Sequence, residues 1–343
     1  MNIESINKYD KDNMIEVIKE LYIHIEHSFD IILESNLNPK NNVKNILICG
    51  MGGSAIGGDF VRTVLKDDFK IPIFVNRDYD LPNWVSQNTL IFICSYSGNT
   101  EETISCYNST VNNNIKPIVI SSGGHILEDA KKNNFDFVQL PKGIQPRAAF
   151  GYSASLLLLA LVKIGIIDKK YSDQLFNSIE SIKNNSSKYS SISKGNDALE
   201  LSKIIYNKFP IIYCTLNTEV VAFRLRCQLA ENAKILSSHF VLPEQNHNEI
   251  EGFSNNDISN YIILWLKDKN DNERTIKRIN ITSKLLKKIK YQFVYSEKSD
   301  SLIERLFNLI YLFDWVSFYC AIHHRTNPTP VNTILELKSL MSK

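Results

Sequence analysis

The sequence predicts an α/β protein built on parallel sheets with helices on both faces. Apolar strand-like runs alternate with helix-like runs along most of the chain, as in repeated β-α-β units. The alternation stops in a Ser-, Asn- and Lys-rich stretch at residues 183–198 and then restarts, so we expect two halves. We place an N-terminal helical segment at residues 1–40, a first domain at 41–170 and a second domain at 195–343.

Hydrophobic periodicity predicts the individual elements in chain order. A single amphipathic helix is expected over residues 11–34, where apolar residues recur every three or four positions. In the first domain we expect strands at 45–49, 71–75, 89–94, 117–120 and 136–139, and helices at 55–66, 100–111, 126–133 and 151–166. In the second domain we expect strands at 210–214, 261–266 and 291–295, helices at 218–236, 273–289 and 301–323, and a C-terminal helix with Lys338.

Composition and charge are typical of an enzyme of the cell interior. The chain has 343 residues, 43% of them hydrophobic, and can bury one large core or two ordinary ones. A formal net charge of +2 without a basic run argues against nucleic acid or an anionic membrane as partner. Without a leader pattern or an uncharged apolar run of about 18 residues, we expect a cytoplasmic protein. The six cysteines include no C-x-x-C pair and are expected to be reduced core residues.

A glycine-rich turn follows the first expected strand, between Gly50 and Asp59. Glycines let the backbone turn tightly and approach a ligand, and the N–H groups that open the next helix point at that ligand, which makes an anion site. The stretch from Gly50 to Ala55 also satisfies the dinucleotide fingerprint G-x-G-x-x-A. A dinucleotide requires an acidic ribose partner after the next strand, which residues 76–78, Asn-Arg-Asp, neither supply cleanly nor exclude.

A second loop, after the third expected strand, brings three hydroxyls, a glycine and a helix start together. Ser95, Ser97 and Thr100 can donate hydrogen bonds to a phosphate together with nearby backbone N–H groups. The alternative is a capping box, in which Asn99 and Glu102 only satisfy the helix end. Both interpretations can hold, because a capped helix end and an anion site use different N–H groups.

Five segments, taken in order, resemble one known family. These segments are Gly50 to Asp59, Ser95 to Thr103, Pro146 to Tyr152, Glu231 to Lys234 and Pro243 to Glu249. From about residue 45 to the C-terminus the chain resembles the bifunctional phosphoglucose/phosphomannose isomerases, which contain two sugar isomerase (SIS) domains. The resemblance implies two SIS-type doubly wound parallel-sheet domains (αβα sandwiches) with extra N- and C-terminal helices.

The resemblance also implies an activity and a set of site residues. The activity is the interconversion of glucose 6-phosphate and mannose 6-phosphate with fructose 6-phosphate through a cis-enediol, with no metal and no nucleotide cofactor. The residues expected to bind substrate are Gly53, Ser54, Ser95, Ser97, Thr100 and Arg147. Glu231 is expected to be the base, and His247 and Lys338 to serve ring opening and closing. A homodimer is expected, with His247 supplied to the partner's site from a polar connection at residues 242–253.

Elementary chemistry supports a carboxylate at Glu231. Moving a carbonyl between C1 and C2 takes a proton from one carbon and returns it to its neighbour, which a single carboxylate can do. Glu231 follows a helical pattern with one expected buried face, formed by Val220, Phe223, Cys227 and Ala230. The alternative is a surface glutamate paired with Lys234 or Arg226.

Arg147 and His247 fit the remaining chemistry. Arg147 lies in a loop at an expected sheet edge, where a cation stabilises the charge of an enediolate; the alternative is a surface arginine. His247 can pass a proton between the ring oxygen and O1 at neutral pH. His247 and Glu249 could suggest a metal cluster, yet no second histidine pair with ligand spacing supports zinc, so we expect no metal. Four other histidines are expected on the N-terminal helix surface, at positions 24 and 27, and as helix-dipole partners, at 323 and 324.

Three functions stay open at this point. The isomerase of glucose and mannose 6-phosphates is the first, and activity on glucose 6-phosphate alone is its narrower form. The second is an isomerase of another sugar or aminosugar phosphate, because the phosphate loops are shared. The third is a non-catalytic sugar-phosphate sensor, which would normally carry a basic DNA-binding helix-turn-helix that residues 1–44 lack.

Overall fold

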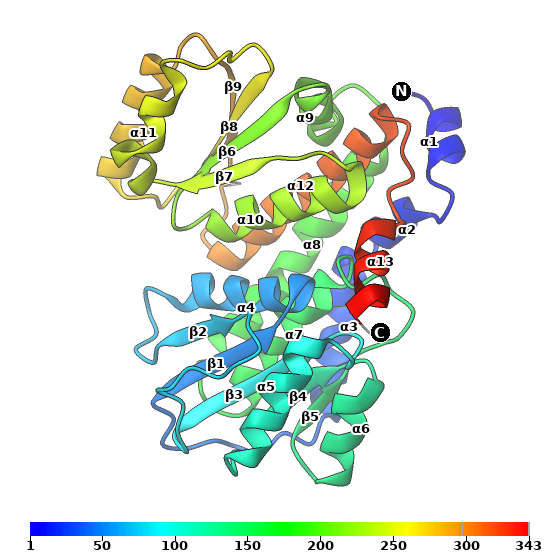
Figure 1. The fold of residues 1–343 in the computed structure, drawn as a ribbon, viewed down its shortest axis with the longest axis vertical. Coiled ribbons are helices and arrows are strands. Elements are labelled where there is room, and N and C mark those ends of the chain that lie inside the picture. Colours follow the sequence, from blue (N-terminus) through cyan, green and yellow to red (C-terminus); the bar gives the residue numbers. More distant parts are fainter. Residues whose placement is uncertain (297, 342–343) are drawn as a thin grey trace. The chain divides into compact units, whose positions relative to one another are not determined.

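The computed structural model describes residues 1–296 and 298–341 and divides the chain into two compact units (Figure 1). We call residues 20–180 the first unit, and residues 1–19 together with 181–343 the second unit. Each unit contains one parallel sheet with helices, which confirms the predicted fold class.

The first unit has a five-stranded parallel sheet in the order β2-β1-β3-β4-β5. Its strands are β1 (Asn45–Gly50), β2 (Ile73–Asn76), β3 (Thr89–Ser95), β4 (Ile118–Ser121) and β5 (Phe137–Gln139). The strand order reverses between β1 and β3, the point at which ligands of doubly wound sheets bind. Gly50 pairs with Cys94 at the ends of these two strands, so the loops that follow them start side by side.

Helices cover both faces of this sheet. They are α3 (Leu21–Glu34), α4 (Gly52–Leu65), α5 (Glu101–Asn112), α6 (Gly124–Lys132) and α7 (Phe150–Lys163). Residues of α5 and α6 pack in one apolar cluster with Leu47, Ile91 and Val119 of the sheet. On the opposite face, a Cβ on Gly58 of α4 would lie 3.0 Å from a methyl carbon of Ile48, so the helix lies directly on β1. The first unit is therefore an αβα sandwich.

The second unit has a four-stranded parallel sheet in the order β7-β6-β8-β9. Its strands are β6 (Phe209–Cys214), β7 (Ser238–Val241), β8 (Tyr261–Lys267) and β9 (Lys290–Tyr295). Its helices are α1 (Ile3–Tyr9), α2 (Met14–Lys19), α9 (Asp197–Ile205), α10 (Glu219–Gln228), α11 (Glu273–Leu285), α12 (Leu302–His323) and α13 (Asn332–Met341). Ile279 of α11 packs on Ile211 and Trp265 of the sheet. Strand β7 was not expected, because its residues are all half-buried and include Ser238 and His239.

Helix α12 forms the centre of the second unit's helical layer and packs on α9 and α10. It is long and apolar enough to cross a membrane by length and composition alone. However, 94% of its most apolar window is buried within the protein. It also carries Arg305 and Asp314, both buried in ion pairs. These features are those of a core helix.

One expectation about the helices is wrong. The single helix expected over residues 11–34 is split into α2 and α3, and the Asp10 carboxylate starts α2 by accepting the N–H groups of Met14 and Ile15 at 2.8 and 2.9 Å. The stretch expected to separate the halves is partly helical, because α8 (Lys170–Ser190) runs into it. The division between the two units falls inside α8.

Candidate active site

The loop between β1 and α4 lies against β3 because it lacks side chains. A Cβ on Gly50 would lie 2.8 Å from the carbonyl oxygen of Cys94, so only glycine allows this approach. Gly52 opens α4 with a φ of 51°, a conformation that favours glycine. The first turn of α4 contains the half-buried Ser54 and no acidic side chain. The loop therefore presents a helix N-terminus that can hold an anion.

Arg147 lies beside this loop and is buried, with 6% of its surface exposed. A Cβ on Gly53 would lie 2.8 Å from the carbonyl oxygen of Pro146 and 3.6 Å from the Cα of Arg147. The Ser153 hydroxyl of α7 donates a hydrogen bond to the Gly53 carbonyl at 3.2 Å and fixes the two segments together. Burial contradicts the alternative of a surface arginine.

The serine loop, residues 95–100, folds back on itself at the end of β3. The hydroxyls of Ser95 and Thr100 are hydrogen-bonded at 3.0 Å, and Ser95 also accepts the Gly98 N–H at 3.1 Å. Ser95 is buried, whereas Ser97 is exposed and Thr100 half-buried. Helix α5 begins directly after Thr100, and its first-turn N–H groups have no partner within the helix. Ser95 therefore supports the loop from within, while Ser97 and Thr100 keep access to a ligand.

The N-cap of α5 is Thr100 and not Asn99, so the capping-box alternative is wrong. The side-chain oxygen of Asn99 accepts the N–H of His125 at 2.9 Å. Asn99 thus ties the serine loop to the next loop of the sheet.

That next loop, residues 121–124 after β4, belongs to the site although the motifs above do not include it. A Cβ on Gly98 would lie 1.8 Å from the carbonyl oxygen of Gly123, and one on Gly124 would lie 2.3 Å from that of Ser97. Gly98 and Gly124 also have φ values of 67° and 70°. Any other residue at either position would both adopt a disfavoured φ and clash with the neighbouring loop. The sequence signal for this loop is Ser-Ser-Gly-Gly directly after an apolar strand.

In the first unit, all six predicted substrate-binding residues therefore lie at the carboxyl end of the parallel sheet. These residues are Gly53, Ser54, Ser95, Ser97, Thr100 and Arg147. Hydroxyl groups, two helix N-termini and a guanidinium are groups that bind a phosphate or another oxyanion.

Glu231 lies in the second unit, on a π-helical turn (Leu229–Ala233) that continues α10. Such turns are rare and are frequently found at functional sites. The turn ends at Lys234, whose φ is 58° and whose ammonium donates to the main-chain oxygen of Glu231 at 2.6 Å. Asn232 in the same turn donates to the Ser317 hydroxyl of α12 at 2.9 Å. The turn is thus held at both sides, and the Glu231 side chain is half-buried.

A buried ion pair fixes α10, and with it this turn, to α12. The Arg224 guanidinium donates to both carboxylate oxygens of Asp314, at 2.9 and 2.7 Å, and the Gln228 amide donates to the same carboxylate at 3.0 Å. Removing one partner of such a pair typically costs about 3–5 kcal/mol, because the other charge stays buried without a partner. The helix that carries Glu231 is therefore strongly positioned.

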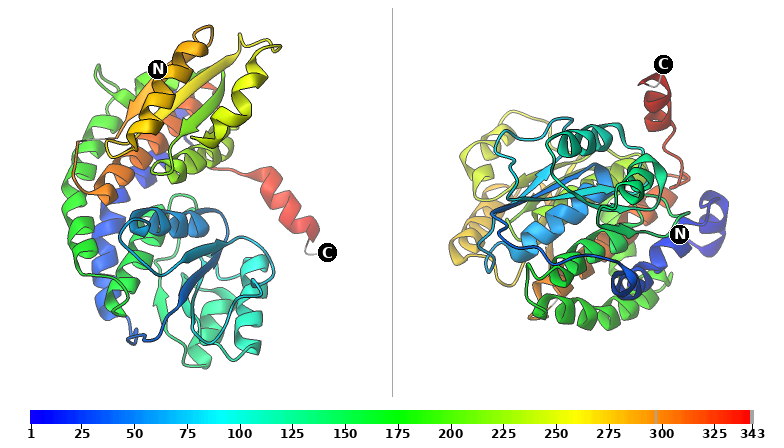
Figure 2. Two further views of the ribbon diagram at one scale, coloured as in Figure 1. Left: turned by 90° about the vertical axis from the view of Figure 1, so that its left-hand side faces the viewer. Right: turned by 90° about the horizontal axis from the view of Figure 1, so that it is seen from below.

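His247 and Lys338 are both exposed in the second unit. His247 ends a short 3₁₀ helix, and the preceding Asn246 anchors this helix by donating to the Thr282 hydroxyl of α11 at 2.9 Å. Lys338 lies on α13, all of whose residues are exposed, and Figure 2 shows this helix extending from the rest of its unit. The second unit by itself does not enclose Lys338.

Some other side chains are placed differently from expectation. His24 is 1% exposed and stacks on Tyr152 at 4.5 Å, so it is not on the surface, and burial lowers its pKa to about 4. Burial also lowers the pKa of His323 to about 4, so this histidine is uncharged at neutral pH and cannot serve as a cationic dipole partner. The apolar face expected on α10 is wrong, since Phe223 and Cys227 are half-buried and Ala230 is exposed.

Among residues 1–296 and 298–341, no three His, Cys, Asp or Glu side chains lie close enough together to hold a metal ion. All six cysteines are free, and all but Cys227 are buried, as expected for reduced core residues.

Comparison with known proteins agrees with this architecture. A SIS domain model matches residues 41–163, and a model described as bacterial phospho-glucose isomerase C-terminal SIS domain matches residues 194–341. The bifunctional phosphoglucose/phosphomannose isomerase of Caldicellulosiruptor bescii is 38% identical over 96% of this chain and 99% of its own length. The enzyme of the same name from Aquifex aeolicus is 36% identical over 88% of this chain and 91% of its own length.

A crystal structure of a hypothetical protein from Thermus thermophilus has the same fold. Its TM-score is 0.77 with 12% identity, over 99% of this chain and 92% of that one.

Fold, site and domain matches together define a protein of two SIS domains. The chain belongs to the bifunctional phosphoglucose/phosphomannose isomerase family, as the sequence motifs indicated.

The contact between the serine loop and the third loop predicts the effect of a methyl group at Gly98. Replacement of Gly98 by Ala introduces both a disfavoured φ and a clash with Gly123, whereas Gly143→Ala, at a φ of 91° with open space around it, introduces only the first. We expect Gly98→Ala to lower the free energy of unfolding by about 1–3 kcal/mol more than Gly143→Ala, the usual cost of overpacking. Urea unfolding of both variants measures this difference, and equal losses would contradict the close packing of the two loops.

The serine loop predicts a second effect, on ligand affinity. Replacing Ser97 and Thr100 by Ala removes two hydroxyl donors, and each hydrogen bond to a charged group contributes about 1.5–3 kcal/mol. We expect the double variant to bind sorbitol 6-phosphate at least about 100-fold more weakly by calorimetry. Ser172→Ala, at a half-buried position of α8 outside the loops, is the matched control. Unchanged affinity in a folded double variant would reject the serine loop as the phosphate site.

Proposed function

We propose that this protein interconverts glucose 6-phosphate and mannose 6-phosphate with fructose 6-phosphate. The observation that carries the proposal is the group of hydroxyls, helix N-termini and Arg147 at one sheet edge, in a chain 38% identical to a relative named for both isomerase activities. In the proposal the glycine and serine loops hold the 6-phosphate, since their donors and helix dipoles match a dianion.

Proton transfer is assigned to Glu231. The carboxylate takes the proton from C2 of the open-chain aldose, the C2–H electron pair forms the C1=C2 bond, and the carbonyl oxygen at C1 becomes an enediol oxygen. Return of the proton to C1, with transfer of the proton on the C2 oxygen to the C1 oxygen, gives the ketose. Arg147 is assigned to stabilise the negative charge on the enediol oxygens, because a cation there favours the transition state over the ground state.

Ring opening is assigned to His247 and Lys338. An imidazole can carry a proton between the O1 hydroxyl and the ring oxygen at neutral pH, and an ammonium can donate to the same oxygens. Both side chains are exposed within the second unit, which fits groups that act on a ligand or on a partner rather than in a core. We extend the proposal to a homodimer in which His247 acts in the site of the partner subunit.

Activity on two epimers follows from the intermediate. Glucose 6-phosphate and mannose 6-phosphate differ only in configuration at C2, and both give the same enediol once the C2 proton has left. A single base serves both if rotation about the C2–C3 bond presents the C2 proton to Glu231 from either epimer.

Because hexose phosphates are charged and are retained inside cells, we place the enzyme in the cytoplasm.

The base assignment predicts a selective loss of turnover. Glu231→Gln keeps the shape of the side chain but not its basicity, so we expect kcat to fall at least about 100-fold, with the affinity for sorbitol 6-phosphate unchanged. Glu219→Gln, on the first turn of the same helix, is the control and should retain normal turnover. A coupled assay with both hexose 6-phosphates and glucosamine 6-phosphate measures the rates and tests the substrate class. A near-normal rate in Glu231→Gln would place the base elsewhere.

The mechanism uses only side chains, which predicts resistance to chelators. Activity on both hexose 6-phosphates should survive prolonged dialysis against EDTA and require no added nucleotide, because a carboxylate and a guanidinium supply the chemistry. Loss of activity with EDTA and its recovery with zinc would overturn this mechanism.

The shared site predicts complementation between inactive subunits. In a mixture of Glu231→Gln and His247→Ala chains, a heterodimer has one site that receives Glu231 from one subunit and His247 from the other. We expect activity to recover toward a quarter of the wild-type value at equal mixing, since half of the dimers are mixed and each regains one of two sites. Native mass spectrometry checks subunit exchange. Exchange without recovery would mean that His247 acts within its own chain.

A further inference from the structure

The two sheets can be compared strand by strand, because in both the first strand lies between the second and the third. β6 therefore corresponds to β1 and β8 to β3, and the strand order of the second sheet reverses between β6 and β8. In the first sheet this point carries the predicted phosphate loops. The loops after β3 and β8 have the same length, with residues 96–100 and 268–272 between strand and helix. Asp271 then takes the position of Asn99, one residue before the helix N-cap.

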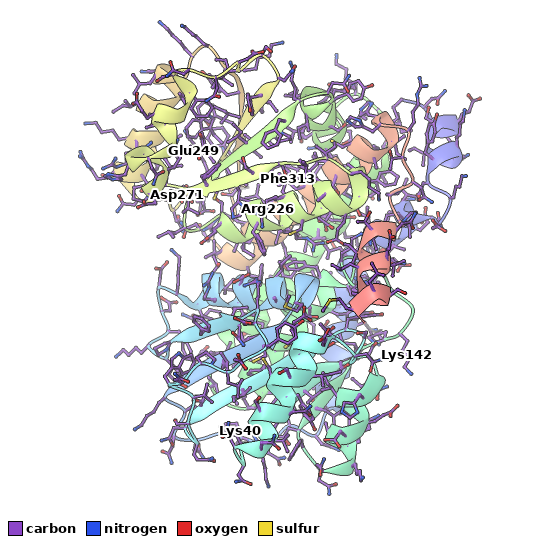
Figure 3. All side chains as sticks on the ribbon, in the orientation of Figure 1. Lys40, Lys142, Arg226, Glu249, Asp271 and Phe313 are labelled. Atoms are coloured by element: carbon purple, nitrogen blue, oxygen red, sulfur yellow. The ribbon has the colours of Figure 1, made fainter. Side chains whose placement is uncertain are left out.

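The Asp271 carboxylate lies at this reversal point and is hydrogen-bonded on both oxygens. One oxygen accepts the Thr215 hydroxyl at 2.6 Å and the Asn217 amide at 3.0 Å, both from the loop after β6. The other oxygen accepts the backbone N–H of Asp268 at 2.7 Å. Figure 3 labels Asp271 near the carboxyl end of this sheet. The loops after β6 and β8 thus surround the Asp271 carboxylate with hydrogen-bond donors. The loops after β1 and β3 are proposed to surround a phosphate in the same way.

This cluster is closed to solvent. Asp271 is 7% exposed, Thr215 3% and Asn217 9%. Burial raises the pKa of the Asp271 carboxyl, while the hydrogen bonds from Thr215, Asp268 and Asn217 act in the opposite direction. The negative charge of the neighbouring Asp268 is neutralised by Arg305, whose guanidinium nitrogens lie 2.7 and 3.0 Å from that carboxylate. Without Asp271, the Asn217 amide and the Asp268 N–H would lose this acceptor, and an unmade hydrogen bond is costly in a buried place.

The position of Ser95 also differs between the sheets. Its counterpart at the end of β8 is Lys267, which is 8% exposed, donates to Asn280 at 3.0 Å and lies 4.3 Å from the centre of the Phe293 ring. In place of the Ser95 hydroxyl, the second sheet therefore has the ammonium of Lys267, which contacts Asn280 and Phe293.

We propose that the second sheet retains an oxyanion site at its reversal point and that the chain's own Asp271 carboxylate is its permanent occupant. The carboxylate excludes a second sugar phosphate, so each chain has one such site, on the first sheet. Without the carboxylate the site takes a small oxyanion of the same class, such as formate.

Rescue by formate tests this proposal. Asp271→Ala removes the carboxylate and leaves its space, whereas Asp271→Asn fills that space with a neutral group of the same shape. We expect sodium formate to raise the Tm of Asp271→Ala by about 3 °C over sodium chloride at equal concentration, through binding to the folded state, and to leave wild type and Asp271→Asn unchanged. Equal Tm values of Asp271→Ala in formate and chloride would overturn the proposal. Anion binding on the first sheet is common to all three proteins, so the result does not depend on the proposed function.

Two shape-preserving variants keep the proposal testable if Asp271→Ala does not fold. Thr215→Val removes one donor to the carboxylate, and charge-assisted hydrogen bonds are about twice as strong as neutral ones. We expect Thr215→Val to lower the Tm of wild type more than it lowers the Tm of Asp271→Asn. Equal shifts in the two backgrounds would show that Thr215 does not hold the anion and would contradict the proposal.

Discussion

The predicted phosphate site depends on the contact of backbone with backbone between neighbouring loops of the first sheet. Gly98 and Gly123, Gly124 and Ser97, and Gly53 and Pro146 approach so closely that a Cβ at the glycine would lie less than 3 Å from a carbonyl oxygen. Parallel strands bring the starts of these loops together, and the missing side chains let the loops close. The hydroxyls and helix N-termini can converge only because the glycines leave that space.

The second unit positions Glu231, the proposed base, by polar contacts instead. Glu231 lies on a π-helical turn that is tied to α12 through Asn232 and, two turns earlier, through the Arg224–Asp314 pair. Buried charges of this kind add little net stability but are costly to separate, so they fix one arrangement of two helices. A base that must meet one carbon atom benefits from this fixed arrangement more than from a larger apolar contact.

The sequence predicts the elements in which apolar periodicity and loop chemistry coincide, but not those that depend on tertiary contacts. β1 and β3 were predicted because they are continuous apolar runs that end in glycine or serine loops. β7 was missed because Ser238 and His239 interrupt its apolar pattern, and its place beside β6 depends on pairing. The buried face of α10 could not be predicted, since its partner Asp314 lies 90 residues away in the chain. Helix α8 enters a stretch whose polar composition suggested a linker, because Ile182 and Tyr189 bury one side of it.

The central claim is that isomerisation proceeds by proton transfer through an enediol. Running the reaction in D₂O and following the recovered sugar phosphates by NMR tests this claim most directly. A base that exchanges its proton with solvent puts deuterium at C2 of glucose 6-phosphate and mannose 6-phosphate and at C1 of fructose 6-phosphate, and the account predicts this labelling in the wild-type protein. Interconversion of the three compounds without deuterium at either carbon would indicate a direct hydride shift and would contradict the account.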